Sequence, residues 1–423
     1  MRILICGASG FIGRALCEHL SSAGHDIVRG VRKARSSSDI HIDYNRDTRV
    51  DDWIPRLAGI DAVVNAVGII VEHDRTRFEE AHEQTPIALF TACARAGVKR
   101  VIQISALGAE TGITAYFKTK RAADDALMRL PVEWQILMPS LVYGPDGASA
   151  MAFRTLASLP VIPVPALPTA TRFQPIHIAD LVAAVQYALD PATPAGQQIT
   201  CVGCTRTTLR GMLQTYRTGM GLGTAWWLHI PTPLISLAAV VGGAIPGSTL
   251  TPDTWRMLKS GSAADSGQLE HALGRSPRSL ENFITQRESA ILRSAAIMAW
   301  CVPLLRFVMA GLWILTAIIS AFLYPHHDSM ILLAGIGLTG TTATAALYGA
   351  ITLDLIMGLA ALIRPSRALW ALQALLVIGY TAAIGVTMPD WLVHPFGPIL
   401  KNLPILAILA VLAAENPRWN TSS

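Results

Sequence analysis

The start of the chain constrains the fold more than any other stretch. Five residues with strand-like apolar character, Arg2–Cys6, precede three glycines spaced three apart, Gly7, Gly10 and Gly13, and a helix-like run over 14–22 follows. In such a unit the first glycine permits a sharp turn, the second lets backbone N–H groups approach a pyrophosphate, and the third lets helix and strand pack closely. The helix N-terminus then faces the phosphate charge. The sequence therefore predicts a dinucleotide site at this turn.

The composition divides the chain in two. Hydrophobic residues make up 52% and charged residues 15% of the 423 residues, which is too apolar for a typical soluble protein. Only nine charged residues lie after Ser294. We therefore predict a soluble domain at 1–290 and a membrane domain at 291–423. The net charge of +5 is dispersed and accompanies no nucleic-acid motif, so we expect membrane lipid and no nucleic acid as a partner.

The N-terminus and the cysteines indicate the compartment. No basic leader with an apolar run precedes the first strand, so we expect no cleavable signal and a cytosolic front domain. Six scattered cysteines fit a reducing compartment. Cys201 and Cys204 have CxxC spacing but no second pair, so we favour an ordinary strand end over redox or metal chemistry and predict no metal site.

Strands and helices alternate through the front domain. We expect strands over 26–31, 61–68 and 98–105 and a helix over 76–96. This alternation predicts an α/β domain with a parallel, doubly wound sheet, whose ligands bind at the carboxyl ends of the strands.

The expected second strand ends in basic residues, Arg32-Lys33-Ala34-Arg35. An acidic side chain there suits the ribose hydroxyl of NAD, whereas a basic one suits the 2′-phosphate of NADP. We therefore favour NADP(H), with NAD(H) left open and a solvated basic turn as the structural alternative. Asp43, just past a third short strand, is predicted to contact the adenine.

Ser105 lies at a strand end, and Tyr116 and Lys120 share one face of the following helix. An ammonium beside a phenol is expected to lower the pKa of the phenol, which would make Tyr116 a proton donor or acceptor. Ser105 could hydrogen-bond the same substrate oxygen. Simple packing and solvation of the two helix residues is the alternative.

Five segments together resemble the extended or atypical short-chain dehydrogenase/reductases, within the epimerase/dehydratase superfamily. They are GASGFIG at 7–13, NAVG at 65–68, QISALGA at 103–109, YFKTK at 116–120 and ILMPSLVYGP at 136–145. The stretch before Ser105 is most similar to the branch that contains the accessory Rossmann subunit of respiratory complex I. The resemblance covers roughly residues 1–290 and implies a Rossmann domain with a small substrate lobe.

The resemblance also implies roles for individual residues. Ser105, Tyr116 and Lys120 would match the catalytic Ser, Tyr and Lys. Only eleven residues separate Ser105 from Tyr116, fewer than in the active extended enzymes, and this branch includes proteins that bind cofactor without known turnover. The implied cofactor-binding residues are Gly7, Ser9, Gly10, Phe11, Ile12, Gly13, Arg32, Asp43, Ala66, Val67, Gly68, Tyr116, Lys120, Pro139, Ser140, Leu141 and Val142.

Later segments of the front domain carry weaker signals. The segment 172–180 resembles the family's entry into the substrate lobe, and we expect structural roles for His177 and for Asp180, which could cap a helix. The apolar stretch 226–245 contains a tryptophan pair and is broken by Pro231 and Pro233. We predict that it rests on the membrane surface, with a fifth span as the alternative.

Four segments of the back domain approach bilayer length, and they predict an all-α four-helix transmembrane domain: 297–323, 341–363, 368–388 and 398–414. The segment 330–338 is too short to span and could dip in or extend the second helix. Arg364 and Arg367 lie between the second and third spans, so the positive-inside rule places the N-terminal domain in the cytosol of a multi-pass inner-membrane protein.

Asp354 and Arg306 are the ions deepest in these spans. Such residues are functional candidates because an unpaired ion in hydrocarbon is costly. A structural pair between the two, or an interfacial position, is the alternative. The four-span pattern, with His394-Pro-Phe-Gly-Pro before the last helix, resembles the DoxX-like family, some of whose members are linked to quinone-coupled redox chemistry.

The sequence thus predicts a membrane-anchored, NADP(H)-binding oxidoreductase that acts on a lipophilic carbonyl, hydroxyl or quinone-like substrate. One alternative is a non-catalytic cofactor-binding subunit or redox sensor with membrane-protein partners. A second is a nucleotide-sugar epimerase or dehydratase.

Overall fold

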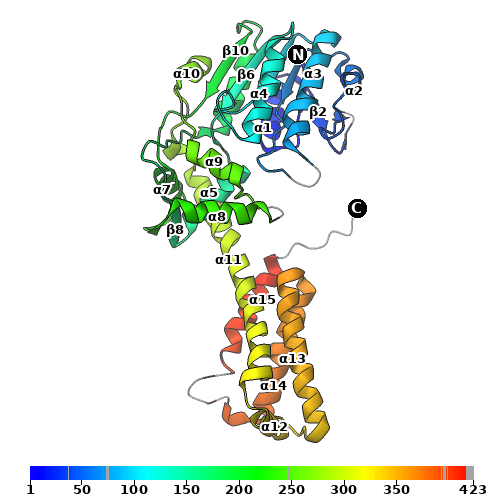
Figure 1. Ribbon diagram of the computed structural model, residues 1–423, viewed down its shortest axis with the longest axis vertical. Coiled ribbons are helices and arrows are strands. Elements are labelled where there is room, and N and C mark those ends of the chain that lie inside the picture. Colours follow the sequence, from blue (N-terminus) through cyan, green and yellow to red (C-terminus); the bar gives the residue numbers. More distant parts are fainter. Residues whose placement is uncertain are drawn as a thin grey trace. The chain divides into compact units, whose positions relative to one another are not determined.

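The computed structural model describes residues 1–36, 38–72, 76–245, 248–391, 393, 397 and 399–415. The chain forms two compact units, Met1–Ala296 and Ile297–Ser423 (Figure 1). The first unit is α/β and the second is helical, so the predicted fold class is confirmed.

A seven-stranded sheet forms the centre of the first unit. Its strand order is β3-β2-β1-β4-β5-β6-β10, and every neighbouring pair is parallel. The order reverses between β1 and β4, and ligands of such sheets bind outside the carboxyl ends of the strands at this point. The strands are β1 (Arg2–Cys6), β2 (Asp26–Val31), β3 (Asp39–His41), β4 (Ala62–Asn65), β5 (Arg100–Ile104), β6 (Glu133–Pro139) and β10 (Gln197–Cys201).

Helices cover both faces of this sheet. Buried side chains of α1, α6 and α10 pack on one face, and those of α2, α3 and α4 pack on the other. The predicted helix over 76–96 is a π-helical turn, η2, that leads into α3. The bounds are α1 (Phe11–Ser22), α2 (Val50–Trp53), η1 (Ile54–Leu57), η2 (Glu79–Gln84), α3 (Thr85–Ala96), α4 (Ala115–Met128), α6 (Ile178–Leu189) and α10 (Gly267–Leu273).

A smaller lobe is built from the later part of this unit. Two parallel strand pairs, β7 with β9 and β8 with β11, lie among helices that share a separate apolar core. The predicted surface segment forms strand β11 and helix α8, and α8 is too short to be a span. The elements are β7 (Val142–Tyr143), α5 (Ala148–Ser158), β8 (Val161–Pro165), β9 (Ile176–His177), α7 (Leu209–Gly219), β11 (Trp226–Ile230), α8 (Thr232–Gly243), α9 (Pro252–Ser260) and η3 (Leu280–Asn282).

The second unit contains the long apolar helices. Three helices in the described part of the chain are long and apolar enough to cross a membrane: Gln286–Leu323, Gly340–Ile363 and Arg367–Thr387. Helices α11 and α13 cross closely at Gly358, where an added Cβ would lie 3.0 Å from the Ala310 carbonyl oxygen. The elements are α11 (Gln286–Ile318), η4 (Ile319–Leu323), α12 (His326–Gly335), α13 (Gly340–Ile363), α14 (Arg367–Thr387), η5 (Pro389–Trp391) and α15 (Asn402–Glu415).

The predicted fourth span is shorter than expected. Helix α15 has 14 residues, fewer than the roughly 20 that a bilayer crossing needs. The chain forms a turn at 399–401, and the polar residues Lys401 and Asn402 directly precede the apolar part of the helix. Residues 330–335 of the segment 330–338 belong to a separate short helix, α12, and the segment does not extend α13. Of the motif before the last helix, His394–Phe396 and Pro398 lie outside the described residues.

Candidate functional site

The glycine turn has the geometry that the sequence predicts. Gly7 has φ +81°, a left-handed conformation that favours glycine. An added Cβ at Gly13 would overlap the Gly7 carbonyl, so helix α1 can approach β1 only with glycine there. The N-cap residue of α1, Gly10, provides no side-chain hydrogen bond to the first turn. The N–H groups of Phe11, Ile12 and Gly13 are therefore available to an anion.

The segment after β4 lies directly beside this turn. An added Cβ at Gly7 would lie 3.0 Å from Val67 Cγ2 and 3.2 Å from the carbonyl oxygen of Ala66. One at Gly68 would lie 3.7 Å from Lys120 Nζ. Because the side chains at 66–68 are small, the backbone after β4 packs closely against both the glycine turn and Lys120. These three parts therefore meet at the carboxyl ends of β1 and β4.

Arg32 and Asp43 occupy the same edge of the sheet, after β2 and β3. Arg32 is exposed and has no ion-pair partner among the described residues. Asp43 is engaged in its own turn, where its Oδ1 accepts a hydrogen bond from the Asn45 N–H at 3.1 Å and its other oxygen pairs with Arg46 at 3.8 Å. Arg32 is therefore free to meet a phosphate, whereas Asp43 already has partners.

The loop after β6 reaches the glycine turn through Phe11. An added Cβ at Gly144 would lie 2.6 Å from the Phe11 ring, so the ring rests on this glycine. Within the predicted segment 139–142, Ser140 Oγ instead donates to the Gln174 carbonyl at 2.6 Å. The backbone of this segment lies near the site, and the Ser140 hydroxyl has a structural partner.

Helix α4 carries Tyr116 and Lys120. Lys120 Nζ donates to the carbonyl oxygens of Ile104, at 3.0 Å, and Val67, at 3.3 Å. These contacts connect α4 to the ends of β5 and β4. The Tyr116 ring lies edge-on to Phe78, His82 and Phe117, and its hydroxyl has no hydrogen-bond partner in the described part of the chain.

Ser105 does not turn toward Tyr116. Its Oγ donates a hydrogen bond to the carboxylate of Asp124, which lies two turns after Tyr116 on the same helix. Asp124 is 7% exposed, and its second oxygen has no partner among the described residues. The Ser-Tyr-Lys arrangement implied by resemblance is thus altered, because a buried acid holds the serine hydroxyl.

Burial dominates the electrostatics of this cluster. It raises the pKa of Tyr116 to about 12, and the nearby Asp124 charge adds to the effect. The expectation that Lys120 lowers the Tyr116 pKa is therefore wrong. Burial lowers the pKa of Lys120 to about 8, with Asp124 opposing the shift, and raises the pKa of Asp124 to about 6.

Several buried polar residues at this site had escaped the sequence analysis. Tyr44 donates to Asn65 Oδ1 and Asn65 Nδ2 donates to Gln103 Oε1, both at 2.8 Å. His82 Nε2 accepts the Ile69 N–H at 3.0 Å, and burial holds its pKa well below the usual range. The signal for Asp124 was its spacing: it follows Lys120 by four residues on the face that Tyr116 and Lys120 share.

His177 and Asp180 have structural partners. His177 Nδ1 caps α6 by accepting the Ala179 N–H at 3.1 Å. Asp180 is fully buried and pairs with Arg275 at 2.6 Å. Cys201 is buried and Cys204 is exposed. No group of three or more His, Cys, Asp or Glu that could hold a metal occurs among the described residues.

In the helical unit, Asp354 and Arg306 do not pair. The Arg306 guanidinium donates to the carbonyl oxygens of Ala361, at 2.6 Å, and Leu362, at the C-terminal end of α13. Asp354 is 7% exposed, and its Oδ1 has no partner in the described part of the chain. The structural-pair alternative is wrong, because Arg306 satisfies helix-end carbonyls instead.

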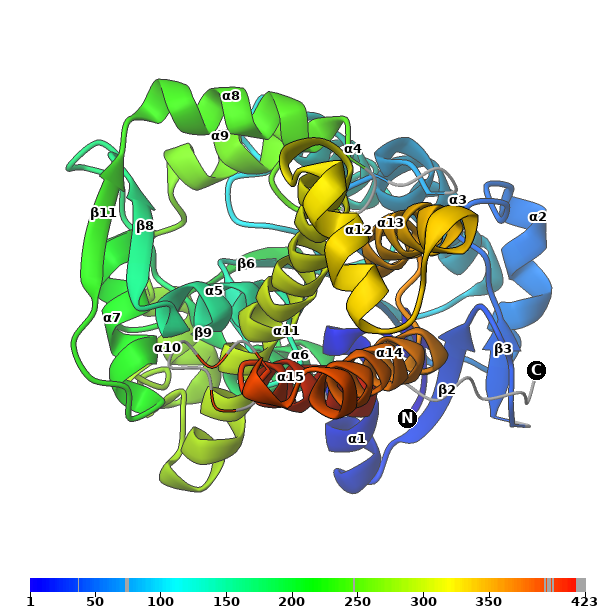
Figure 2. The same cartoon turned by 90° about the horizontal axis from the view of Figure 1, so that it is seen from below.

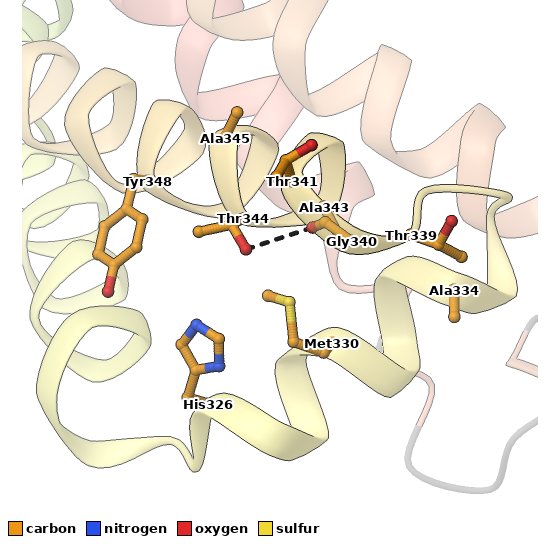
Figure 3. A pocket seen from close by; sticks show the side chains of 10 residues that line it. All are labelled: His326, Met330, Ala334, Thr339, Gly340, Thr341, Ala343, Thr344, Ala345 and Tyr348. Atoms are coloured by element: carbon orange, nitrogen blue, oxygen red, sulfur yellow. Dashed lines mark hydrogen bonds between the residues drawn. The ribbon is translucent and has the colours of Figure 1, made fainter.

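A pocket of about 770 Å³ lies in the helical unit between α12 and α13 (Figure 3). Small side chains of α13, including Ala343 and Thr344, form one wall, and Met330 of α12 points into the space from the other. His326 and Tyr348 lie at one end, with ring centroids 6.5 Å apart. The pocket contains none of the predicted site residues, and no lysine or arginine lines it.

Two family matches cover the two units. Residues 7–154 match the NAD(P)H-binding family, and residues 310–410 match the DoxX-like family. The first match contains the glycine turn, Ser105, Tyr116 and Lys120. The second extends from the middle of α11 into α15.

Individual relatives resemble the first unit. Subunit 9 of the NADH dehydrogenase (ubiquinone) 1 alpha subcomplex from Arabidopsis thaliana is 28% identical over 202 residues, 44% of this chain and 49% of that protein. A ceramide reductase from Caulobacter vibrioides is 27% identical over 187 residues, 43% of this chain and 58% of that protein. The chain thus spans about half the length of these relatives.

A solved structure shares the fold. The NADPH-dependent quinone oxidoreductase QOR2 from Escherichia coli, complexed with NADPH, superposes with a TM-score of 0.54 at 19% identity. The match covers 67% of this chain and 98% of that one.

Proposed function

Because the chain joins an NAD(P)H-binding Rossmann domain, homologous to proteins of the short-chain dehydrogenase and epimerase type, to a DoxX-like domain, we propose that it is a membrane-anchored reductase of a lipophilic carbonyl compound. The observation that carries the proposal is the union of two features at one sheet edge. The first turn of α1 offers backbone N–H groups, which no side-chain cap occupies among the described residues, to a pyrophosphate, and Tyr116 and Lys120 lie beside the neighbouring strand ends.

The nucleotide would supply the hydride. Gly10 and the first turn of α1 would bind its pyrophosphate, and Gly68 and Lys120 would border its ribose side. Tyr116 would donate its phenolic proton to the substrate oxygen as the carbonyl carbon receives the hydride, which yields an alcohol and the oxidised nucleotide. Lys120 would position the cofactor, because its ammonium is fixed by backbone carbonyls.

The raised pKa of Tyr116 keeps its phenol protonated, as a proton donor for carbonyl reduction. At neutral pH a phenol with a pKa of about 12 is protonated, which is the form that donates a proton to a carbonyl oxygen. Alcohol oxidation would need the phenolate, which burial disfavours. Arg32, exposed and without a carboxylate partner in the described part of the chain, supports NADPH as the preferred nucleotide.

A lipophilic substrate fits the attached helices. Three helices are long and apolar enough to cross a membrane, so the site would operate beside lipid. One relative is named a ceramide reductase, and ceramide is a lipid. We propose that the substrate of this chain is also a lipid.

We place the first unit on the cytosolic side of the inner membrane. Within the helical unit, Arg306 and Arg367 bind helix-end carbonyls of α13 and α15, so both lie at the end that includes Arg364. The connections at the other end include one lysine, Lys401, and no arginine. By the positive-inside rule the arginine end faces the cytosol, and α11 enters the helical unit at that end.

The test is NADPH oxidation by the full chain in proteoliposomes, with either a membrane-dissolved long-chain ketone or a water-soluble sugar nucleotide as substrate. The proposal expects turnover with the ketone. NADPH oxidation with the sugar nucleotide alone would contradict it. The epimerase alternative, which is redox-neutral, predicts instead epimerised sugar nucleotide in the product analysis with no net oxidation of NADPH.

A non-catalytic, cofactor-binding subunit is the second candidate. The observation that favours it is the Ser105 hydroxyl, which is bound to Asp124 instead of pointing to Tyr116. A relative named as a dehydrogenase subunit fits the same role. This candidate predicts nucleotide binding without turnover on any ketone, together with co-purifying membrane-protein partners.

A further inference from the structure

A long uncharged segment exposes large apolar side chains on the first unit. Between Arg217 and Asp253 the chain contains no Asp, Glu, Lys or Arg. On β11, Trp226 is 82% exposed. Contiguous exposed apolar surface of this kind marks a site of protein or membrane contact. Large apolar side chains of α8, and Ile245 two residues after it, are 55% to 62% exposed: Leu234, Leu237, Val240, Val241 and Ile245.

The opposite face of α8 is already packed. Its small residues Ser236, Ala239 and Gly242 turn toward α9, and Trp255 of α9 donates its indole N–H to Ser236 Oγ at 2.9 Å. An added Cβ at Gly242 would overlap the Leu250 carbonyl oxygen. The two helices therefore form a tight hairpin, here named the α8–α9 hairpin, in which they lie side by side (Figure 2).

The same hairpin borders the candidate site. Met257 of α9 packs on a small apolar cluster of Ala106, Ala109 and Phe117. Tyr116 packs on that cluster too. One side of the hairpin thus touches the surroundings of Tyr116, while its other side presents bare apolar surface.

The occupant that best fits this surface is a lipid bilayer. At 12 residues α8 is about 18 Å long, too short to cross a bilayer but suited to lying in its interface. Trp226, just before the helix, has the amphipathic ring that favours the headgroup region. The chain itself continues into helices that are long and apolar enough to cross a membrane, so a bilayer would always be tethered to this unit.

We propose that the α8–α9 hairpin is a membrane-contacting cover of the Tyr116 site. The outer face of α8 lies in the boundary between headgroups and acyl chains, and a lipid substrate reaches Tyr116 along the hairpin. The inference of lipid contact depends only on the exposed apolar face of α8. The inference of a substrate path also rests on the proposed function.

The first experiment measures lipid contact. An environment-sensitive fluorophore is placed at Val240→Cys in the full chain, with Cys17, Cys204 and Cys301 replaced by serine, in nanodiscs with and without acyl-brominated phosphatidylcholine. The matched control is Arg256→Cys on the exposed face of α9. We expect a blue-shifted emission that brominated lipid quenches at position 240, and water-like, unquenched emission at position 256.

Two results would overturn lipid contact. One is water-like emission at both positions. The other is a blue shift at position 240 that brominated lipid does not quench, which would indicate a protein on this face, such as a second copy of the chain. Nucleotide binding by the labelled chain serves as the control for folding.

The second experiment tests the substrate path. Leu237→Glu is compared with Leu237→Met for NADPH-dependent reduction of a membrane-dissolved ketone in proteoliposomes. We expect a raised KM for the ketone with the glutamate only, and unchanged NADPH affinity in both variants. An unchanged KM would overturn the path. Absence of turnover in the unmodified chain would contradict the proposed function, while the fluorescence result would still decide the lipid contact.

Discussion

The two halves of the candidate site differ in how they are built. The nucleotide half consists of backbone: the glycine turn, the start of α1 and the small residues at 66–68. The reaction half consists of side chains from two elements, Ser105 after β5 and Tyr116, Lys120 and Asp124 on α4, which packs against η2. The comparison teaches that binding geometry is determined locally here, whereas acid–base chemistry depends on which charges are buried together.

The largest effect should follow a change in the nucleotide half. Gly13→Ala puts a Cβ against the Gly7 carbonyl, so we expect loss of detectable nucleotide binding and a destabilisation of roughly 3 kcal/mol. Isothermal titration and thermal unfolding check this result. Gly223→Ala, where an added Cβ meets nothing within 4 Å, is the matched control. Normal binding by the Gly13 variant would show that the turn is not the pyrophosphate site.

The second-largest effect should follow a change in the reaction half that leaves the nucleotide half intact. Tyr116→Phe should lower ketone turnover by about 10²- to 10⁴-fold, because the proton donor is lost, and should leave NADPH affinity unchanged. Steady-state kinetics and titration measure the two quantities. Tyr187→Phe on α6 is the control. Unchanged turnover would remove Tyr116 from the chemistry and leave only the nucleotide half.

A smaller effect concerns the buried acid. Because burial raises the Asp124 pKa to about 6, ionisation of this group costs stability as pH rises from about 4 through 6. Asp124→Asn removes that cost, so the melting temperature of the variant relative to the unmodified chain should increase over this pH range. Over this range the free energy of unfolding of the variant, relative to that of the unmodified chain, should increase by an amount on the order of 2 kcal/mol. A difference that stays flat with pH would contradict the raised pKa.

The smallest effect concerns the choice of nucleotide. Arg32→Asp should shift the ratio of NADPH to NADH affinity by about tenfold or more toward NADH, because a charge-assisted hydrogen bond to the 2′-phosphate is lost. Arg129→Asp, at the C-terminal end of α4, is the control and should leave the ratio of NADPH to NADH affinity unchanged. A constant ratio in the Arg32 variant would favour the solvated basic turn.

The parts of the fold that follow local rules were predictable. Glycine spacing and the alternation of strands and helices identify the parallel sheet, since each rule depends on neighbouring residues. The Ser105–Asp124 contact and the direction of the Tyr116 pKa shift were not predictable, because both depend on burial that only tertiary packing creates. For the same reason the sequence did not reveal that Arg306 binds α13 carbonyls instead of Asp354.

The most direct measurement is isothermal titration of NADPH and NADH into the full chain purified in detergent. The account predicts one site per chain, with tighter binding of NADPH in the micromolar range. No heat of binding with either nucleotide up to about 1 mM, from protein whose circular dichroism shows an intact fold, would contradict it.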